Sequence, residues 1–579
     1  MILELLAAPA MALVLAAAGS RLRRGLRLPV RPALRLPVDF LLGCWALAGA
    51  VLLLGLSHLW SRVTLPAVLA VFALAGVWRR GGWRWGWLAP GALAALAVLP
   101  AALPPPYFYD ALVYHLGLPW QAILEGGLRP HPEDVFSAFP PLAQLLAAVP
   151  LSVGLVGVPA LMHLCSFVVA GGAAAALART LGAPRWAASL AAFCVPLLPG
   201  HALVPALPAA EGWTVAGVLG AAAVVLAPSV RPGGAALAGM LVGIAAASRL
   251  QGVPWALLVV SLAALRGGVR WRAGLLALAG SVAGSAPWWV KNLVLLSDPT
   301  APLTWRREGM ATLWRDAGSL VHLTRWSDGA HEVIAALAPH AAYLIPLLLA
   351  AALAAVAAGG GRARLAVLLA GAGFVAWAAT GILPRFLTPS VAIVTAAAAA
   401  AAGPGAWRSR AGPWASALGL GVTAVFGGVF SVQQLAALGG LGLLRGSAES
   451  IAPRWVANDP RPLFAASSAL PADARVLFVG EARGFGFPRR FVAPSQHDVS
   501  PLRAILEATG SPAAACAELR RLGFTHLLVN WGELARLARG YPVAPWRDAA
   551  GRPRWSAFVA ALPPPAVEAN GVQVFVLPG

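Results

Sequence analysis

A series of long apolar runs joined by short connections constrains the fold most. A membrane helix needs roughly 20 predominantly apolar residues, and by that rule the sequence offers about fourteen candidate segments. They lie near residues 3–19, 38–58, 63–78, 87–103, 156–178, 186–204, 208–227, 234–248, 252–266, 273–293, 335–358, 363–382, 386–402 and 413–435. Charged residues make up 11% of the chain, against about 25% in soluble proteins. The sequence therefore predicts a polytopic α-helical membrane protein.

The arginines predict how the spans are oriented. Every second connection is rich in arginine: Arg21 to Arg35, Arg79 to Arg84, Arg179 to Arg185, Arg231, Arg266 to Arg272, Arg362 to Arg364 and Arg408 to Arg410. By the positive-inside rule these connections are cytoplasmic, which places residues 104–141, 294–334 and everything after about 440 outside. The formal charge of +21 comes from these short loops and lacks a basic face interleaved with aromatic residues. It therefore indicates membrane topology, and no nucleic-acid partner is predicted.

The sequence pattern changes from long apolar runs to short strand-like and helix-like segments at about Pro471, where a small extracytoplasmic α/β domain is predicted. Strands are expected at Val476 to Val479, at Thr525 to Asn530 and in the final VQVFVLPG, with a helix ending at Gly523. The segment GEARGFGF lacks the GxGxxG spacing of a nucleotide loop, so no nucleotide cofactor is predicted.

The connection 104–141 carries an unusual share of the acids. Asp110, Glu125, Glu133 and Asp134 lie here together with His115, in a chain with only 22 Asp and Glu. Acids in a membrane protein are costly unless they are used or solvated, which predicts a catalytic loop. Asp110 stands among aromatic residues, where burial would favour proton acceptance, although a helix N-cap is the simpler alternative.

The loop also contains acids that do not form an obvious pair, and a helix follows it. Glu133 and Asp134 are neighbours in sequence and should point in different directions, which argues against a tight pair made of these two. Residues 141–155 are too short and too bounded by proline to cross, so a helix at the outer interface is expected.

Four further charges are predicted near the same membrane face. Glu211 lies at the outer end of a span, where it could meet Asp110 in one cavity or contact headgroups. Arg249 interrupts an apolar region and suits a phosphate, with a snorkelling side chain as the alternative. Lys291 is the only lysine of the chain, and Arg385 stands between Pro384 and Pro389. Both could bind phosphate oxygens.

The motifs YDALVYHLGLP, PEDVFSAFPPL, SRLQGVPW, PWWVKNLVLLSDPTAPL and LPRFLTP together resemble the bacterial GT-C glycosyltransferases of the protein-mannosyltransferase and lipid A aminoarabinose-transferase type, family 39. The resemblance covers roughly residues 86–400. It implies a transmembrane catalytic core over 86–440, preceded by additional N-terminal helices over 1–85 and followed by the α/β domain over 441–579. Two departures are an arginine-leucine pair at Arg249 where many relatives have lysine-tyrosine, and Glu211 where they have aspartate.

The resemblance implies an enzyme of the bacterial inner membrane. It would move a sugar from a polyprenyl-phosphate donor to an envelope glycan, lipid or protein on the outer face. Asp110 would act as general base with His115 and Glu211 nearby, and Arg249, Lys291, Asn292 and Arg385 would bind the lipid phosphate. No metal ligands or cofactor are predicted, although a divalent metal is not excluded. The rivals are a transporter or flippase of lipid-linked saccharides and a catalytically silent membrane scaffold.

Overall fold

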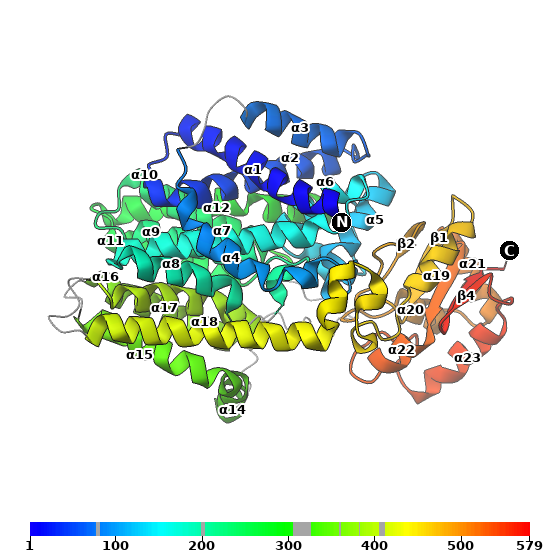
Figure 1. Cartoon of the computed structure of the whole chain (residues 1–579). Helices are drawn as coiled ribbons and strands as arrows, with labels where there is room; N and C mark the ends of the chain where they lie inside the picture. Colours follow the sequence, from blue (N-terminus) through cyan, green and yellow to red (C-terminus); the bar gives the residue numbers. More distant parts are fainter. Residues whose placement is uncertain are drawn as a thin grey trace.

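A helical bundle carries a separate α/β domain at one end (Figure 1). The computed structural model describes residues 1–76, 82–198, 203–304, 326–357, 361–380, 383–403 and 411–578. Arg79 and Arg80, residues 408–410 and part of the connection 294–334 lie outside this range, so their predicted placement is not addressed.

Each predicted apolar segment contains a helix. The helices are α1 (Ile2–Gly25), α2 (Arg35–Leu56), α3 (Thr64–Gly76), α4 (Ala89–Leu96), α7 (Val158–Leu181), α8 (Arg185–Cys194), α9 (Glu211–Val225), α10 (Pro232–Ser248), α11 (Gly252–Arg266), α12 (Arg270–Leu296), α15 (Ala341–Ala357), α16 (Gly361–Thr380), α17 (Thr388–Ala400) and α18 (Ala411–Leu438), with α14 (Trp326–Leu337) before α15. Within the described ranges, seven helices are long and apolar enough to cross a membrane. Several others are shorter, α4 having only 8 residues. The number of crossings therefore stays a prediction.

The two ends of the bundle differ in chemistry. Helix α7 has 24 residues, a length of about 36 Å, close to the thickness of a bilayer core. Just before its first residue, the amide of Gly157 donates to Glu4 Oε1 at 2.7 Å. At its other end, Arg31 and Arg362 donate to the hydroxyl and the carbonyl of Thr180 at 3.4 and 2.8 Å. The N-terminus lies near the α/β domain (Figure 1). Two of the arginine-rich connections thus meet at the opposite end of the bundle.

The N-terminal helices are integrated into the bundle. A Cβ at Gly19 of α1 would lie 1.7 Å from the carbonyl oxygen of Asp39 on α2, so the two backbones touch. Arg23 Nε pairs with the buried Asp39 Oδ1 at 2.5 Å, and Trp83 Nε1 donates to Asp39 Oδ2 at 2.8 Å. On the other side of α2, Trp45 Nε1 donates to Ala283 O of α12 at 3.1 Å.

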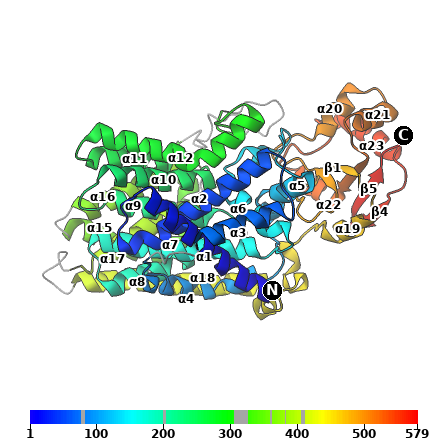
Figure 2. The ribbon, with the colours of Figure 1, turned by 90° about the horizontal axis from the view of Figure 1, so that it is seen from above.

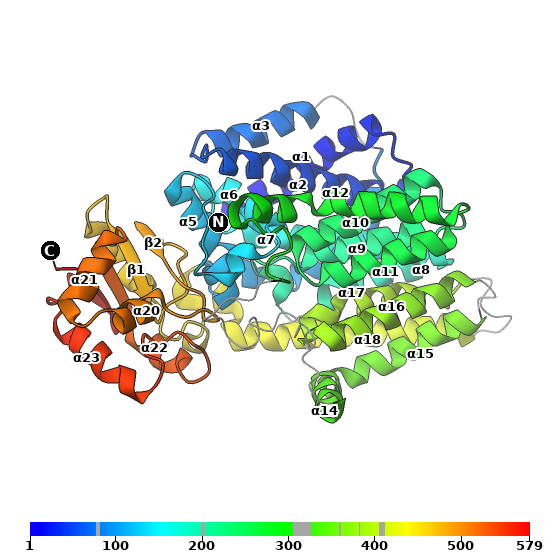
Figure 3. The same cartoon turned by 180° about the vertical axis from the view of Figure 1, so that it is seen from behind.

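Helices α10 and α12 cross equally closely, side by side in Figure 3. A Cβ at Gly239 or Gly243 of α10 would lie 1.9 or 2.2 Å from a backbone oxygen of α12. Gly280 and Gly284 of α12 approach the backbone of α10 in the same way, at 2.1 and 2.3 Å. Small residues four apart let membrane helices come this close. This contact through four glycines, the α10–α12 seam, fixes the relative position of the helix that precedes Arg249 and the helix that carries Lys291.

The loop after Pro104 folds against the end of the bundle. It contains a π-helical turn (η4, Ala111–His115), α5 (Gly117–Glu125), a 3-10 turn (η5, Val135–Ala138) and α6 (Leu142–Ser152). The helix predicted for 141–155 is present, and all of its residues are buried because α2, α3, α5 and α7 pack around it.

The C-terminal domain has a five-stranded sheet in the order β2-β1-β3-β5-β4. The strands are β1 (Arg475–Val479), β2 (Arg490–Val492), β3 (His526–Asn530), β4 (Val567–Ala569) and β5 (Val572–Val576). β1 runs parallel to β2 and β3, and β5 is antiparallel to β3 and β4. The strands predicted near 476, 525 and the C-terminus are confirmed, as is the turn at Gly523, which has a φ of +86°.

The two faces of this sheet are covered by different parts of the chain. Leu477 and Val479 face the helices α20 (Pro501–Ala508), α21 (Pro512–Arg521), α22 (Trp531–Leu537) and α23 (Arg552–Ala560). Val476 and Phe478 face α19 (Arg461–Ala466) together with Trp120 of α5. Strand residues alternate between faces, so one sheet can pack on its own helices and on the membrane loop. Figure 2 shows α5 between the bundle and the domain.

Candidate active site

Four charged side chains from distant segments meet at the bundle end beneath the C-terminal domain. Asp110 precedes η4, Glu211 is the first residue of α9, Arg249 follows the last residue of α10, and Arg385 lies in a 3-10 turn (η11, Pro384–Leu387) before α17. Helix ends have unpaired backbone groups and interrupt the apolar surface. Charged residues at these ends can therefore face one polar cluster.

Three ion-pair contacts link the four residues. Arg385 Nη2 lies 2.9 Å from Asp110 Oδ2, and Arg249 Nη1 lies 2.5 Å from Glu211 Oε1. Arg385 Nε is 3.7 Å from the same Glu211 oxygen, so both guanidinium groups share one carboxylate. The Glu211 side chain is only 5% exposed, whereas those of Asp110 and Arg385 are 23% and 21% exposed. The Asp110 half of the cluster is the accessible half.

Aromatic rings hold the guanidinium planes in place. The Phe386 ring centre is 4.3 Å from the guanidinium carbon of Arg249 and 5.3 Å from that of Arg385, and Phe108 lies 5.5 Å from Arg385. Such cation–π contacts stabilise the cations without using their hydrogen-bond donors.

Asp110 is not a helix cap. Its carboxylate makes no capping hydrogen bond to the following turn and accepts from Arg385 instead. The turn closes through a hydrogen bond from Leu116 N to Ala111 O, five residues apart, at 2.8 Å. This is the wider ring of a π-helical turn, which is often found at functional sites. The N-cap alternative for Asp110 is therefore wrong.

His163, on α7, was missed by the sequence reasoning. Its Nδ1 lies 2.7 Å from Leu207 O, and Gly212 N donates to its Nε2 at 3.0 Å. A carbonyl can only accept, so this pattern assigns the proton to Nδ1 and leaves the ring neutral. The 3.8 Å contact of Nε2 with Glu211 is then no ion pair, and the arginines alone balance the Glu211 charge. A lone histidine inside the apolar run VPALMHLC was the available signal.

His115 is buried beside the cluster with its ring 4.2 Å from that of Tyr114. Burial lowers the pKa of His115 well below its ordinary value, so it is neutral at physiological pH. It lines a small, mainly apolar pocket with Met162 and Trp213.

Lys291 and Asn292 bind the backbone of the loop. The Lys291 ammonium donates to Ser137 O, and Asn292 Nδ2 donates to Ala138 O and Ala301 O at 2.8 and 2.7 Å. The PWWVKN motif thus fastens α12 to residues 137–138, and the Lys291 side chain is buried.

The other loop acids lie in two separate clusters. Glu133 Oε1 is 3.1 Å from His131 Nδ1, and Glu125 Oε2 is 3.4 Å from His131 Nε2. Burial lowers the pKa of His131, but the two carboxylates outweigh it and raise this pKa to about 10. Asp134 is buried and accepts from Phe136 N at 2.8 Å. In the described ranges, no group of three or more His, Cys, Asp or Glu is arranged to hold a metal ion.

Comparison with known proteins shows that the chain has the fold of the GT-C glycosyltransferases. It is similar to ArnT from Cupriavidus metallidurans bound to undecaprenyl phosphate, with a TM-score of 0.51 at 16% identity, over 86% of this chain and 98% of that chain. Apo ArnT matches with a TM-score of 0.51 at 14% identity, over 85% and 98%. The Archaeoglobus fulgidus oligosaccharyltransferase matches with a TM-score of 0.44 at 13% identity, over 77% and 69%.

The likeness concerns the fold. No protein-family model matches the sequence, and no curated protein matches it significantly. The resemblance read from the motifs is confirmed at the level of the fold.

Proposed function

We propose that the protein is a membrane glycosyltransferase. It moves a sugar from a polyprenyl-phosphate donor to a cell-envelope lipid, glycan or protein on the outer face of the bacterial inner membrane. The observation that carries this proposal is the Asp110–Arg385 and Glu211–Arg249 cluster, held at the bundle end in a chain with the fold of ArnT. ArnT was crystallised with undecaprenyl phosphate.

Arg249 and Arg385 form the anion site of this proposal. The Arg385 Nε–H is buried and lacks a hydrogen-bond acceptor among the described residues, although such donors are nearly always paired. A phosphate oxygen between the two guanidinium groups would accept from it, in the planar geometry that arginine favours. Lys291 is the third candidate cation, and its ammonium would have to leave Ser137 to reach a phosphate.

Donor binding would also prepare Asp110. The four charges of the cluster cancel, since two arginines face two carboxylates. The phosphodiester of the donor, a monoanion, entering beside Arg385 competes with Asp110 for that guanidinium. Asp110 would then be free to face the acceptor.

The reaction follows from these positions. Asp110 accepts the proton of the acceptor hydroxyl or amine as that atom bonds to the anomeric carbon. The bond from the anomeric carbon to the phosphate oxygen breaks, with an oxocarbenium-like transition state as in glycoside hydrolysis. The lipid phosphate leaves with the negative charge, which Arg249 and Arg385 stabilise. Glu211 keeps the two arginines in place, while His115 and His163 remain neutral.

The outer-face location is supported by charge asymmetry. The Thr180 end of α7 collects Arg31 and Arg362, whereas the acidic loop and the C-terminal domain lie at the other end. Arginine-rich connections face the cytoplasm.

A transporter is the less favoured candidate, because transporters bind substrate near the bilayer midplane. Proteoliposomes loaded with undecaprenyl phosphate carrying mannose or aminoarabinose distinguish the two. Transfer predicts release of undecaprenyl phosphate that depends on wild-type protein and an envelope acceptor. Movement of the intact donor to the other leaflet without cleavage would contradict the enzyme.

A further inference from the structure

The C-terminal domain holds the catalytic loop at three points that bracket Asp110. Arg461 Nη1 donates to Pro106 O at 3.0 Å, and Phe485 N donates to Leu112 O at 3.1 Å. Between them, the Tyr109 ring centre lies 5.4 Å from the guanidinium carbon of Arg483 and 5.5 Å from that of Arg536. The anchors recur every three residues, at 106, 109 and 112.

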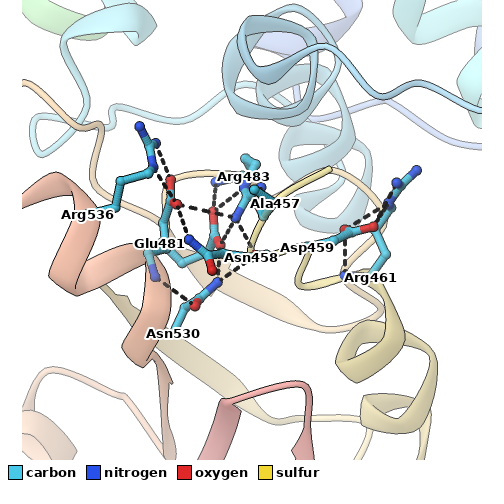
Figure 4. A network of polar contacts seen from close by, with 9 residues as sticks. Ala457, Asn458, Asp459, Arg461, Glu481, Arg483, Asn530 and Arg536 are labelled. Atoms are coloured by element: carbon cyan, nitrogen blue, oxygen red, sulfur yellow. Dashed lines mark hydrogen bonds and ion pairs between the residues drawn. The ribbon is translucent and has the colours of Figure 1, made fainter. Parts of the chain in front are cut away.

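The two arginines that face Tyr109 belong to one network of ion pairs and hydrogen bonds (Figure 4). Glu481 accepts from Arg483 Nε and Nη2 at 2.8 Å each and from Asn530 Nδ2 at 2.7 Å. Arg483 also donates to the carbonyls of residues 457 and 458. Glu533 binds Arg536 through both of its oxygens, at 2.8 and 2.5 Å. The Arg483–Glu481 pair is buried, whereas the Arg536 side chain is 51% exposed and is held by the buried Glu533. Buried hydrogen-bonded networks make the structure around them more rigid.

The place of this network in the fold is informative. Glu481 follows β1, Asn530 ends β3 and Glu533 lies in the first turn of α22, so the polar groups lie outside the carboxyl ends of parallel strands. That edge is where open α/β sheets present their functional groups. Here the segment after β1 contacts the membrane loop, since Phe485 packs with Leu112 and Ala482 packs with Tyr114.

We propose that the C-terminal domain fixes the position of Asp110, with Tyr109 as the positioning residue through which it acts. This inference rests on the proposed role of Asp110. Tyr109 and Asp110 are adjacent, so their Cα atoms are about 3.8 Å apart. One side chain is held by the domain and the other pairs with Arg385 of the bundle. The domain thereby sets the distance between the base and the phosphate-binding arginines.

The test compares two substitutions at one position. Tyr109→Ala removes the ring, and a base displaced by about 1 Å can cost about 10²-fold in rate. We expect kcat to fall by about that factor while the affinity for undecaprenyl phosphate, measured by thermal shift, does not decrease. Tyr109→Phe should match wild type, because the phenol oxygen is buried without a hydrogen-bond partner among the described residues. Hydrogen exchange of the peptide spanning 108–116 should be faster in the alanine variant only.

Gln121→Ala serves as the matched control. It removes another bond between loop and domain, Gln121 Nε2 to Phe491 O at 3.0 Å, but lies eleven residues from Asp110. Equal losses of kcat in Gln121→Ala and Tyr109→Ala would overturn the specific role of Tyr109, as would normal kcat or unchanged exchange in Tyr109→Ala. If Asp110→Asn transfers sugar normally, the proposed role of Asp110 as general base fails instead, and the exchange result still decides whether Tyr109 orders this loop.

Discussion

At the scale of residues, the cluster works because each buried charge has a specific partner. Glu211 is nearly inaccessible and faces Arg249 directly, so removing Arg249 leaves its charge only the longer contact with Arg385. Loss of one member of a buried pair costs about 3–5 kcal/mol. A single substitution of Arg249 would therefore change both the stability of the protein and its binding of the donor, and it could not separate the two effects.

A double substitution separates them. Arg249→Met should lower the melting temperature in detergent strongly, and Arg249→Met with Glu211→Gln should recover most of it by removing the orphaned charge. Neither variant should be stabilised by added undecaprenyl phosphate as wild type is. Normal ligand stabilisation in the double variant would show that Arg249 has a structural role only.

The His131 cluster predicts a pH dependence. The pKa of His131 in the folded protein, about 10, lies above the ordinary histidine value of about 6.5. The charged ring therefore stabilises the fold fully below about pH 6.5, and this stabilisation is lost as the pH rises through about 10. His131→Gln should therefore melt below wild type at pH 6 to 8, and the two curves should converge above pH 10. A gap that widens with pH would contradict this assignment.

At this scale the sequence singled out Asp110, Glu211, Arg249 and Arg385, which the structure brings together, because charges in apolar surroundings stand out. It also singled out Lys291 and Asn292, which bind backbone carbonyls instead. The pairing of each acid with its arginine depends on the tertiary fold, so it could not be predicted from the spacing of the residues in the sequence. Tyr109 was noticed only as an aromatic neighbour of Asp110, since its partners Arg483 and Arg536 lie more than three hundred residues away in sequence.

At the scale of elements, the apolar runs predicted where the helices lie, because a buried helix needs a sustained apolar pattern. Their lengths were predicted less well, since only seven of the described helices are long enough to cross a membrane. The strands β2 and β4 were missed because three residues are too few to show alternation. The α10–α12 seam was readable in GMLVG and GSVAG, two small-residue repeats whose pairing was not recognised.

The seam supplies a prediction at the element scale. Gly243→Val places a branched side chain against the backbone of α12, 2.2 Å from Ser281 O at its first carbon, and should cost about 1–3 kcal/mol or more of stability. Gly371→Val on α16 is the matched control, because its Cβ would meet nothing within 4 Å and that position is exposed. Equal melting temperatures for the two variants would contradict the close crossing.

At the scale of the whole molecule, the acidic loop and the C-terminal domain form one unit at one end of the bundle. Single cysteines near Pro130 and Asp473, in a background without the four native cysteines, should both react with an impermeant reagent in intact cells. A cysteine at Gly268, in the arginine-rich connection after α11, should react only after permeabilisation. Protection of either outer position, or labelling of Gly268 in intact cells, would contradict the proposed orientation.

The central claim is that Asp110 is the general base, and its most direct test is the transfer rate of Asp110→Asn. Asparagine keeps the size of the side chain and removes the proton-accepting charge. Because Asp110 makes no capping bond, its side chain is 23% exposed and Arg385 keeps Glu211 as an acidic neighbour, the variant should insert and fold. Transfer from the polyprenyl-phosphate donor should fall by about 10²–10⁴-fold. Glu133 is another carboxylate of the same loop and pairs with His131, so the Glu133→Gln variant should transfer at the wild-type rate. Near-normal transfer by Asp110→Asn at matched abundance in the membrane would remove Asp110 from the mechanism.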